Sequence, residues 1–127
     1  MIGVDTNVLV RLLTGDDPDQ AGRAANLFAR ESIFIPKTVL LETEWVLRYS
    51  YELSPPVVLT AFRNLLGLPQ VVVEDSGALV EALSRYEDGM DFADALHLAS
   101  VREADGFATF DARLEKRAGR QARVRLL

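Results

Sequence analysis

Four acidic residues occupy positions at which a carboxylate could bind a metal ion or take part in catalysis. Asp5 and Asp111 each follow a short apolar segment, one near each end of the chain. Between them, Glu42 lies within an apolar helical segment, and Asp94 begins the string Asp-Ala-Leu-His-Leu-Ala. Carboxylate oxygens are the ligands that hard divalent cations prefer, and acids in costly apolar surroundings gather at functional sites. The pattern predicts a metal site made of residues that are far apart in the sequence.

Three of these acids also have a purely structural interpretation. Asp5 and Asp111 each precede a helical segment and suit helix caps. Asp91 suits the cap of a helix that carries Asp94 in its first turn, where a negative charge is favourable. Capping and metal binding both remain open for these positions.

Helical geometry separates Glu42 from its neighbour Glu44. At about 100° per residue, Glu42 falls on an apolar arc, whereas Glu44 falls next to Arg48 as an ordinary surface ion-pair partner. We therefore predict that Glu42 points inward and that a group elsewhere in the fold compensates the cost of burying its carboxylate. The aromatic residues expected in the core are Trp45, Phe92 and Phe110.

Strands and helices alternate along the chain. Apolar, β-branched or turn-bounded segments predict strands at 2–5, 32–35, 71–73, 106–109 and 124–126. Periodic segments with cap residues predict helices at 8–13, 18–30, 38–51, 55–66, 77–86, 91–104 and 111–118. This order is typical of an α/β fold, a three-layer α/β/α sandwich with a central, mainly parallel sheet of four to five strands. Functional groups in such sheets lie beyond the carboxyl ends of the strands.

Composition narrows the class of protein. The 127 residues, 49% apolar and 26% charged, predict a single globular domain over residues 1–127. Without cysteine, a metal site must use oxygen ligands, which favours a hard cation such as Mg²⁺ or Mn²⁺. The chain has no membrane-spanning apolar run and no secretion leader, so we expect a cytoplasmic protein with no membrane partner.

The net charge of −5 hides a division along the chain. Residues 111–127 hold six basic and two acidic residues, which gives +4 and leaves −9 for the rest. A basic rim beside an acidic centre suits a phosphodiester substrate, because the rim binds phosphates while cations neutralise the centre. A solvated terminal helix explains the charges equally well.

Four strings taken together resemble the PIN-domain family of metal-dependent nucleases, and in particular the VapC-type toxins of toxin–antitoxin pairs. They are Asp5-Thr6-Asn7-Val8-Leu9, Leu40-Leu41-Glu42, Asp91-Phe92-Ala93-Asp94-Ala95-Leu96 and Thr109-Phe110-Asp111. The resemblance implies that the acidic quartet of the family is Asp5, Glu42, Asp94 and Asp111. It implies supporting roles for Thr6, Asn7, Asp91 and Thr109. It implies that RNA is bound by basic residues of the C-terminal segment, which are Arg113, Lys116, Arg117 and Arg120.

The resemblance also implies an activity and partners. The expected activity is endoribonucleolytic cleavage of RNA that uses Mg²⁺ or Mn²⁺, with two ions present during catalysis. The expected partners are a second copy of the chain, in a homodimer, and a cognate antitoxin. Two alternatives are a receiver-like domain that accepts a phosphoryl group and a non-catalytic module of the same fold that only binds partners.

Overall fold

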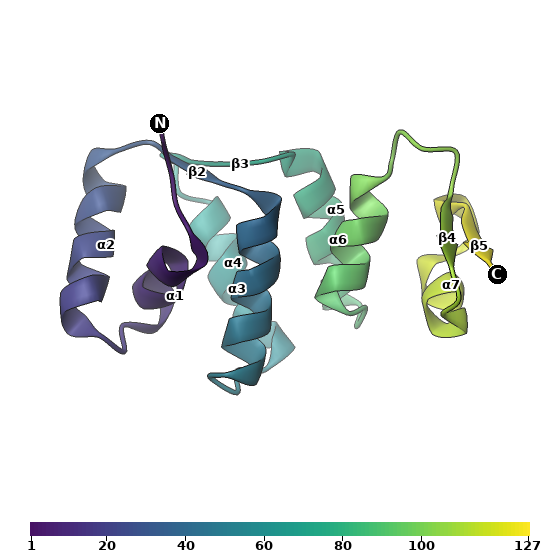
Figure 1. The fold of residues 1–127 in the computed structure, drawn as a ribbon, viewed down its shortest axis with the longest axis horizontal. Coiled ribbons are helices and arrows are strands. Elements are labelled where there is room, and N and C mark those ends of the chain that lie inside the picture. The colour runs from purple at the N-terminus through teal and green to yellow at the C-terminus, as the bar shows by residue number, and fades with distance from the viewer. The chain divides into compact units, whose positions relative to one another are not determined.

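The structure is a computed structural model that describes residues 1–127. It contains two compact units, the N-terminal unit Met1–Ser76 and the C-terminal unit Gly77–Leu127, each described here by itself (Figure 1). The elements of the N-terminal unit are β1 (Ile2–Gly3), α1 (Thr6–Thr14), α2 (Pro18–Arg30), β2 (Ile33–Ile35), α3 (Lys37–Tyr49), α4 (Pro55–Leu66) and β3 (Val71–Val73). Those of the C-terminal unit are α5 (Ser76–Glu87), α6 (Phe92–Ser100), β4 (Phe107–Thr109), α7 (Ala112–Ala118), the 3₁₀ turn η1 (Arg120–Ala122) and β5 (Val124–Leu126).

The N-terminal unit is built on a parallel sheet in the order β1-β2-β3. Ile33 of the central strand is paired with Ile2 on one side and with Val71 on the other, and it is completely buried. Two helices connect each strand to the next, as parallel pairing requires. The carboxyl ends of the three strands therefore share one edge of the sheet, where Asp5 follows β1.

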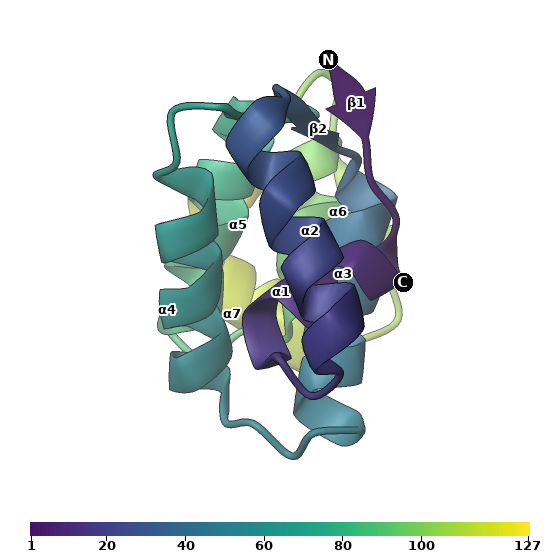
Figure 2. The same cartoon turned by 90° about the vertical axis from the view of Figure 1, so that its left-hand side faces the viewer.

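Glycine and aspartate set the helix ends of this unit. Asp17 caps α2 by accepting a hydrogen bond from the backbone N–H of Gln20 at 3.1 Å, with Pro18 in the first turn. Gly15 ends α1 in the left-handed conformation, with φ of 66°, and its N–H donates to the carbonyl of Arg11. The close turn lets α1 and α2 pack side by side (Figures 1 and 2).

Helix α3 takes its N-terminal cap from a distant residue. Pro36 stands at the cap position and offers no side-chain hydrogen bond. The backbone N–H of Lys37 instead donates to Glu74 Oε1 at 2.9 Å, across the carboxyl edge of the sheet. Glu74, directly after β3, thus fixes the start of the helix that carries Glu42.

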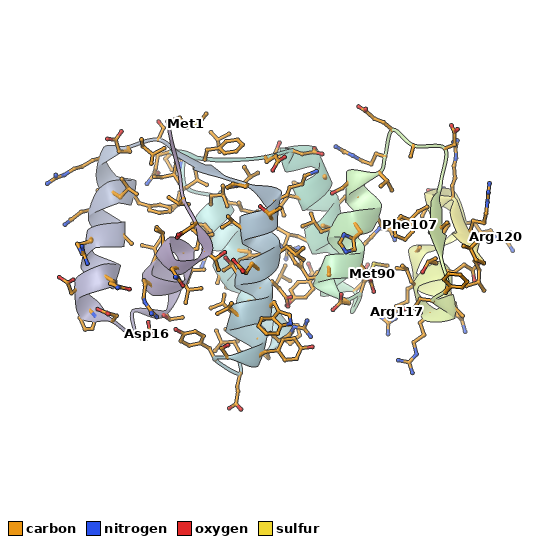
Figure 3. The ribbon with its side chains drawn as sticks, viewed as in Figure 1. Met1, Asp16, Met90, Phe107, Arg117 and Arg120 are labelled. Carbon is orange, nitrogen blue, oxygen red and sulfur yellow. The ribbon has the colours of Figure 1, made fainter.

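A hydrogen-bonded cluster around Asp16 ties the α1–α2 turn to the segment after α3. Tyr51 Oη donates to Asp16 Oδ2 at 2.6 Å, Thr14 Oγ1 donates to Oδ1 at 2.9 Å, and Arg11 Nη1 lies 2.9 Å from Oδ1. Figure 3 shows Asp16 at the turn between the two helices. The Tyr51 hydrogen bond, followed by those from Thr14 and Arg11, lowers the pKa of Asp16 below the ordinary aspartate value of 3.8.

This cluster predicts a pH-dependent contribution to stability. A carboxylate whose folded pKa is depressed stabilises the fold above its unfolded pKa of about 3.8 and loses that effect as pH falls through the folded pKa. We expect Asp16→Asn to lower the melting temperature at pH 7, and the difference from wild type to shrink below about pH 4. Asp19→Asn is the control, since Asp19 is 79% exposed and pairs only with Arg23. An Asp16→Asn difference that persists unchanged at pH 2 to 3 contradicts the assignment.

The C-terminal unit packs α5 and α6 through small and aromatic side chains. Tyr86 and Phe92 meet edge to face, with ring centroids 5.2 Å apart, and Phe92 and Ala95 are completely buried. Gly89, between the two helices, has φ of 101°, a backbone conformation that other residues rarely adopt. After α6, β4 pairs in parallel with β5, with Phe107 opposite Val124.

The α/β class predicted from the sequence is confirmed, and every strand pair is parallel. The five expected strands are present, hydrogen-bonded as three in the N-terminal unit and two in the C-terminal unit. Helix α3 ends at Tyr49 and α6 at Ser100, earlier than the predicted ends at 51 and 104. No helix is long and apolar enough to cross a membrane.

Two of the aromatic residues expected in the core are exposed. Phe92 is buried as predicted, but Trp45 is 56% exposed and Phe110 is 83% exposed. Phe110 lies in the short connection between β4 and α7, outside both elements. Trp45 lies on the face of α3 opposite to Leu40 and Leu47, which are the residues that this helix buries. The prediction was wrong because ring size alone does not decide which helix face is covered.

Candidate active site

Asp5 is the N-cap of α1 at the carboxyl end of β1. Its Oδ1 accepts a hydrogen bond from the backbone N–H of Val8 at 3.2 Å, while Oδ2 has no partner and the side chain is exposed. Asp5 therefore keeps one carboxylate oxygen free of contacts with the protein.

Glu42 is held beside this position by Thr6, the residue that follows Asp5. Thr6 is buried, and its hydroxyl donates a hydrogen bond to Glu42 Oε1. This contact joins the first turn of α1 to the second turn of α3, although the two residues are 36 positions apart. The carboxylates of Asp5 and Glu42 are thus brought to the same region of the N-terminal unit by Thr6.

The predicted orientations of Glu42 and Glu44 are reversed in the structure. Glu42 is exposed, whereas Glu44 is only 2% exposed and forms an ion pair with Arg48, Nε to Oε2, at 2.7 Å. The helical arc that seemed apolar owes that character to Trp45 and Tyr49, and both are more than half exposed. Burial therefore does not distinguish Glu42 as a site residue. Its hydrogen bond with Thr6 does.

In the C-terminal unit, Asp94 stands among other carboxylates. It lies in the first turn of α6, and its backbone N–H donates to Asp91 Oδ2 at 3.2 Å. Burial, followed by the negative charges of Asp91 and Asp111, raises the pKa of Asp94, and His97 opposes the shift.

Asp111 caps α7 just after β4. Its Oδ1 accepts hydrogen bonds from the backbone N–H groups of Arg113 at 2.9 Å and Leu114 at 3.2 Å, and Oδ2 has no partner. Thr109 Oγ1 accepts from the backbone N–H of Asp111 at 3.0 Å and fixes the turn. Thr109 therefore fixes the backbone at Asp111, and the supporting role that the resemblance implies for it stays a prediction.

The capping interpretation holds for Asp5, Asp91 and Asp111, each of which accepts a backbone hydrogen bond at a helix start. Capping does not exclude metal binding, because Asp5 and Asp111 use one oxygen for the cap and keep the other free. Neither unit by itself contains three acidic or histidine side chains grouped closely enough to hold one metal ion. Two of the four predicted acids, Asp5 and Glu42, lie in the N-terminal unit, and the other two, Asp94 and Asp111, lie in the C-terminal unit.

Comparison with known protein families shows to which family this chain belongs. The family model of the PIN domain matches residues 2–120, which include all four acids and span both units. The chain belongs to the PIN domain family. PIN domains are a nuclease family whose members generally bind Mg²⁺. A search of curated proteins found no match to this sequence.

The donor set of this PIN domain fits a hard cation. All four predicted ligands are carboxylates, two of them with an unpartnered oxygen, and the chain has no cysteine. The raised pKa of Asp94 reflects burial first and the negative charges of Asp91 and Asp111 second. Asp5 and Glu42 in the N-terminal unit and Asp94 and Asp111 in the C-terminal unit therefore offer only oxygen donors, the kind that Mg²⁺ and Mn²⁺ prefer.

The PIN domain also has a groove that the sequence did not reveal. It is about 490 Å³ in volume, begins at Asp5 and Asn7, and continues between α1 and α2 past Val8 to Ala24 and Leu27. Asn7 is exposed at the mouth of this groove, and its side chain has no hydrogen-bond partner. A groove between two helices has no local sequence signal, because its walls are set by how closely the helices pack.

Basic residues of the C-terminal segment are free to bind anions. Arg113, Lys116, Arg117 and Arg120 are all exposed, and none forms an ion pair. Figure 3 places Arg117 and Arg120 at the end of the C-terminal unit that holds α7 and η1. Arg113, Lys116 and Arg117 lie on α7 and Arg120 lies in η1, so these cations are available, and their role in binding a substrate stays a prediction.

Proposed function

We propose that this PIN domain is a metal-dependent endoribonuclease, acting as one nuclease domain over residues 1–127. The observation that carries the proposal is the pairing of acids with fixed neighbours at strand ends: Glu42 held by Thr6 next to Asp5, and Asp111 positioned by Thr109 near Asp94. Family membership supports nuclease chemistry. The negative charges of Asp91 and Asp111 near Asp94 favour the entry of a divalent ion.

Each residue has a role in the proposed reaction. Asp5, Glu42, Asp94 and Asp111 would hold Mg²⁺ or Mn²⁺, which would supply activation of water and stabilisation of the departing oxygen of the phosphodiester. Thr6 and Thr109 keep carboxylates in place, which is a positioning role. Asp91 holds the start of α6, and with it Asp94. The free cations of α7 and η1 bind phosphates of the RNA on either side of the cleaved bond.

The proposed partners follow the resemblance to VapC-type toxins. We propose that the chain is the toxin of a type II toxin–antitoxin pair, that it forms a homodimer, and that an antitoxin covers the site. Expression of the wild-type protein is then expected to arrest growth, and co-expression of the cognate antitoxin to relieve the arrest. If cells continue to grow although the purified protein cuts RNA, the toxin role is wrong and the nuclease activity stands.

Metal binding gives the direct test of the site. We expect Mg²⁺ or Mn²⁺ to raise the melting temperature by mass action, with a stabilisation of about 2.7 kcal/mol at a hundredfold excess over Kd. The same titration is expected to fail with Asp94→Asn, because that variant lacks a ligand. A Mg²⁺-dependent cleavage assay on RNA completes the test, and absence of both effects would overturn the proposal.

The basic rim predicts a salt-dependent contribution to RNA binding. Replacing Lys116, Arg117 and Arg120 together by Gln is expected to weaken RNA binding and to reduce the slope of log K against log salt by about 0.7 per lost phosphate contact. Arg30→Gln is the matched control, since Arg30 is also exposed and unpaired but lies on α2. Equal salt slopes for the triple variant and the control would exclude these residues from the RNA interface.

A further inference from the structure

Glu74 bridges the corner at which the central strand β2 leads into α3 (Figure 1). Its backbone N–H donates to the carbonyl of Ile35, the last residue of β2, at 3.0 Å. Its Oε1 accepts from the backbone N–H of Lys37, the first residue of α3, at 2.9 Å. Pro36, between those two residues, has no backbone N–H and makes no side-chain cap. A single residue from the end of β3 therefore holds both sides of the corner.

Asp75, the next residue, makes a second contact with the start of α3. Its Oδ2 lies 3.7 Å from Lys37 Nζ. Consecutive side chains of an extended chain point to opposite sides, but Asp75 has φ of 55°, a left-handed conformation that aspartate tolerates better than most residues. The chain turns sharply there, and two consecutive carboxylates contact the backbone and the side chain of the same lysine. The turn after β3 is thus shaped to hold the first residue of α3.

Glu42 lies on α3 between two anchors that come from the outer strands of the sheet. Thr6, which begins the helix after β1, donates to Glu42 Oε1, and Glu74, directly after β3, holds the start of α3. The helix follows the central strand of the order β1-β2-β3. Glu42 is about 7.5 Å along the helix axis from Lys37, so a movement of the first turn reaches its carboxylate.

We infer that Glu74 is a positioning residue for Glu42 in the proposed reaction. The inference rests on the proposed nuclease function and adds to it a residue outside the four predicted acids. The first N–H groups of a helix have no partner within the helix, so the first turn loosens without an outside acceptor. Loss of a partner that orients a metal ligand typically costs tenfold to a hundredfold in activity or metal affinity.

The positioning role depends on reach and not on charge. Glu74→Gln keeps an oxygen acceptor at the same distance from the backbone, whereas Glu74→Asp keeps the charge and is one methylene shorter. We expect the kcat of RNA cleavage to stay near wild type for Glu74→Gln and to fall about tenfold for Glu74→Asp and Glu74→Ala, with KM unchanged in all three. An active Glu74→Asp together with an inactive Glu74→Gln would mean that the carboxylate binds a cation directly, and would overturn the inference.

Asp17→Ala is the matched control for a lost helix cap. Asp17 accepts from the backbone N–H of Gln20 at 3.1 Å at the start of α2, which carries none of the four predicted acids. Glu74→Ala and Asp17→Ala are expected to lower the melting temperature by similar amounts, and only Glu74→Ala is expected to lower kcat when both are assayed well below melting. Equal kcat values for the two variants would contradict the positioning role.

A double-mutant cycle shows whether Glu74 acts through Glu42. In the Glu42→Gln protein, Glu74→Ala is expected to lower the melting temperature as it does in wild type and to leave the residual cleavage rate unchanged, because the carboxylate that it positions is already lost. Single-turnover rates at high enzyme concentration measure this residue of activity. A tenfold loss in both backgrounds would place the effect of Glu74 elsewhere and overturn the inference.

Amide hydrogen exchange tests the bridge without metal or RNA. The amide of Lys37 is expected to exchange at least tenfold faster in Glu74→Ala than in wild type and to keep its protection in Glu74→Gln. Unchanged exchange in Glu74→Ala would overturn the inference. If Glu42→Gln loses cleavage while Glu74→Ala cuts RNA like Asp17→Ala, the inference alone fails. If Glu42→Gln cuts RNA as fast as wild type, the proposed role of Glu42 fails, and the positioning role of Glu74 with it.

Discussion

Asp5→Asn is expected to reduce metal-dependent RNA cleavage by about a thousandfold and to leave the melting temperature nearly unchanged in the absence of metal. Asn caps a helix about as well as Asp, so the hydrogen bond from Val8 is retained. The charged oxygen that would bind the cation is lost, which removes several kcal/mol of transition-state stabilisation. Initial cleavage rates at saturating Mg²⁺, together with a melting curve, measure both quantities.

Asp17→Asn provides the matched control for this prediction. Asp17 caps α2 through Gln20 just as Asp5 caps α1 through Val8, at 3.1 and 3.2 Å respectively. We expect Asp17→Asn to keep full activity. An Asp5→Asn protein that cuts RNA as fast as Asp17→Asn would remove Asp5 from the reaction.

The second large effect is a division of roles between Glu42 and Glu44. Glu42→Gln is expected to lose cleavage by about a hundredfold or more with little change in stability, because its side chain is exposed and its charge serves the cation. Glu44→Gln is expected to cost about 3 kcal/mol of folding free energy, because it removes one partner of a buried ion pair. Urea denaturation and cleavage rates of the two variants give the comparison.

The control for this pair is the activity of folded Glu44→Gln protein below its melting temperature. It should approach that of wild type, since Glu44 faces the interior of the N-terminal unit and not the site. Loss of cleavage in Glu44→Gln with an unchanged midpoint in urea would mean that the roles are exchanged. Arg48→Gln should reproduce the loss of stability, as it breaks the same ion pair.

Local chemistry made much of this structure predictable. The strand 71–73 and the helix start at Pro18 follow from β-branched residues and from a cap followed by proline, both of which act over a few positions. The positions of Asp5 and Asp111 after strands follow from the same local pattern. These features depend on neighbours in the sequence, which is why a single sequence suffices for them.

Features that depend on tertiary contacts could not be predicted in this way. The face of α3 that is buried is the one with Leu40, Thr43, Glu44 and Leu47, and a glutamate and a threonine gave no apolar signal for it. The contact between Thr6 and Glu42 joins two helices that are adjacent only after folding. The prediction of an inward Glu42 failed for this reason, whereas the shared site of Glu42 and Asp5, which the family resemblance implies, stays a prediction.

The cap that Glu74 supplies to α3 can form only late in the synthesis of the chain. The helix with Glu42 begins at Lys37, whose backbone N–H finds its acceptor 37 residues later in the chain. During synthesis on the ribosome, this helix lacks that acceptor until the strand Val71–Val73 and Glu74 have emerged from the exit tunnel. A nascent chain that stops before Glu74 therefore cannot hold Glu42 as firmly as the finished protein does, so this helix reaches its final state only after more than half of the chain has been translated.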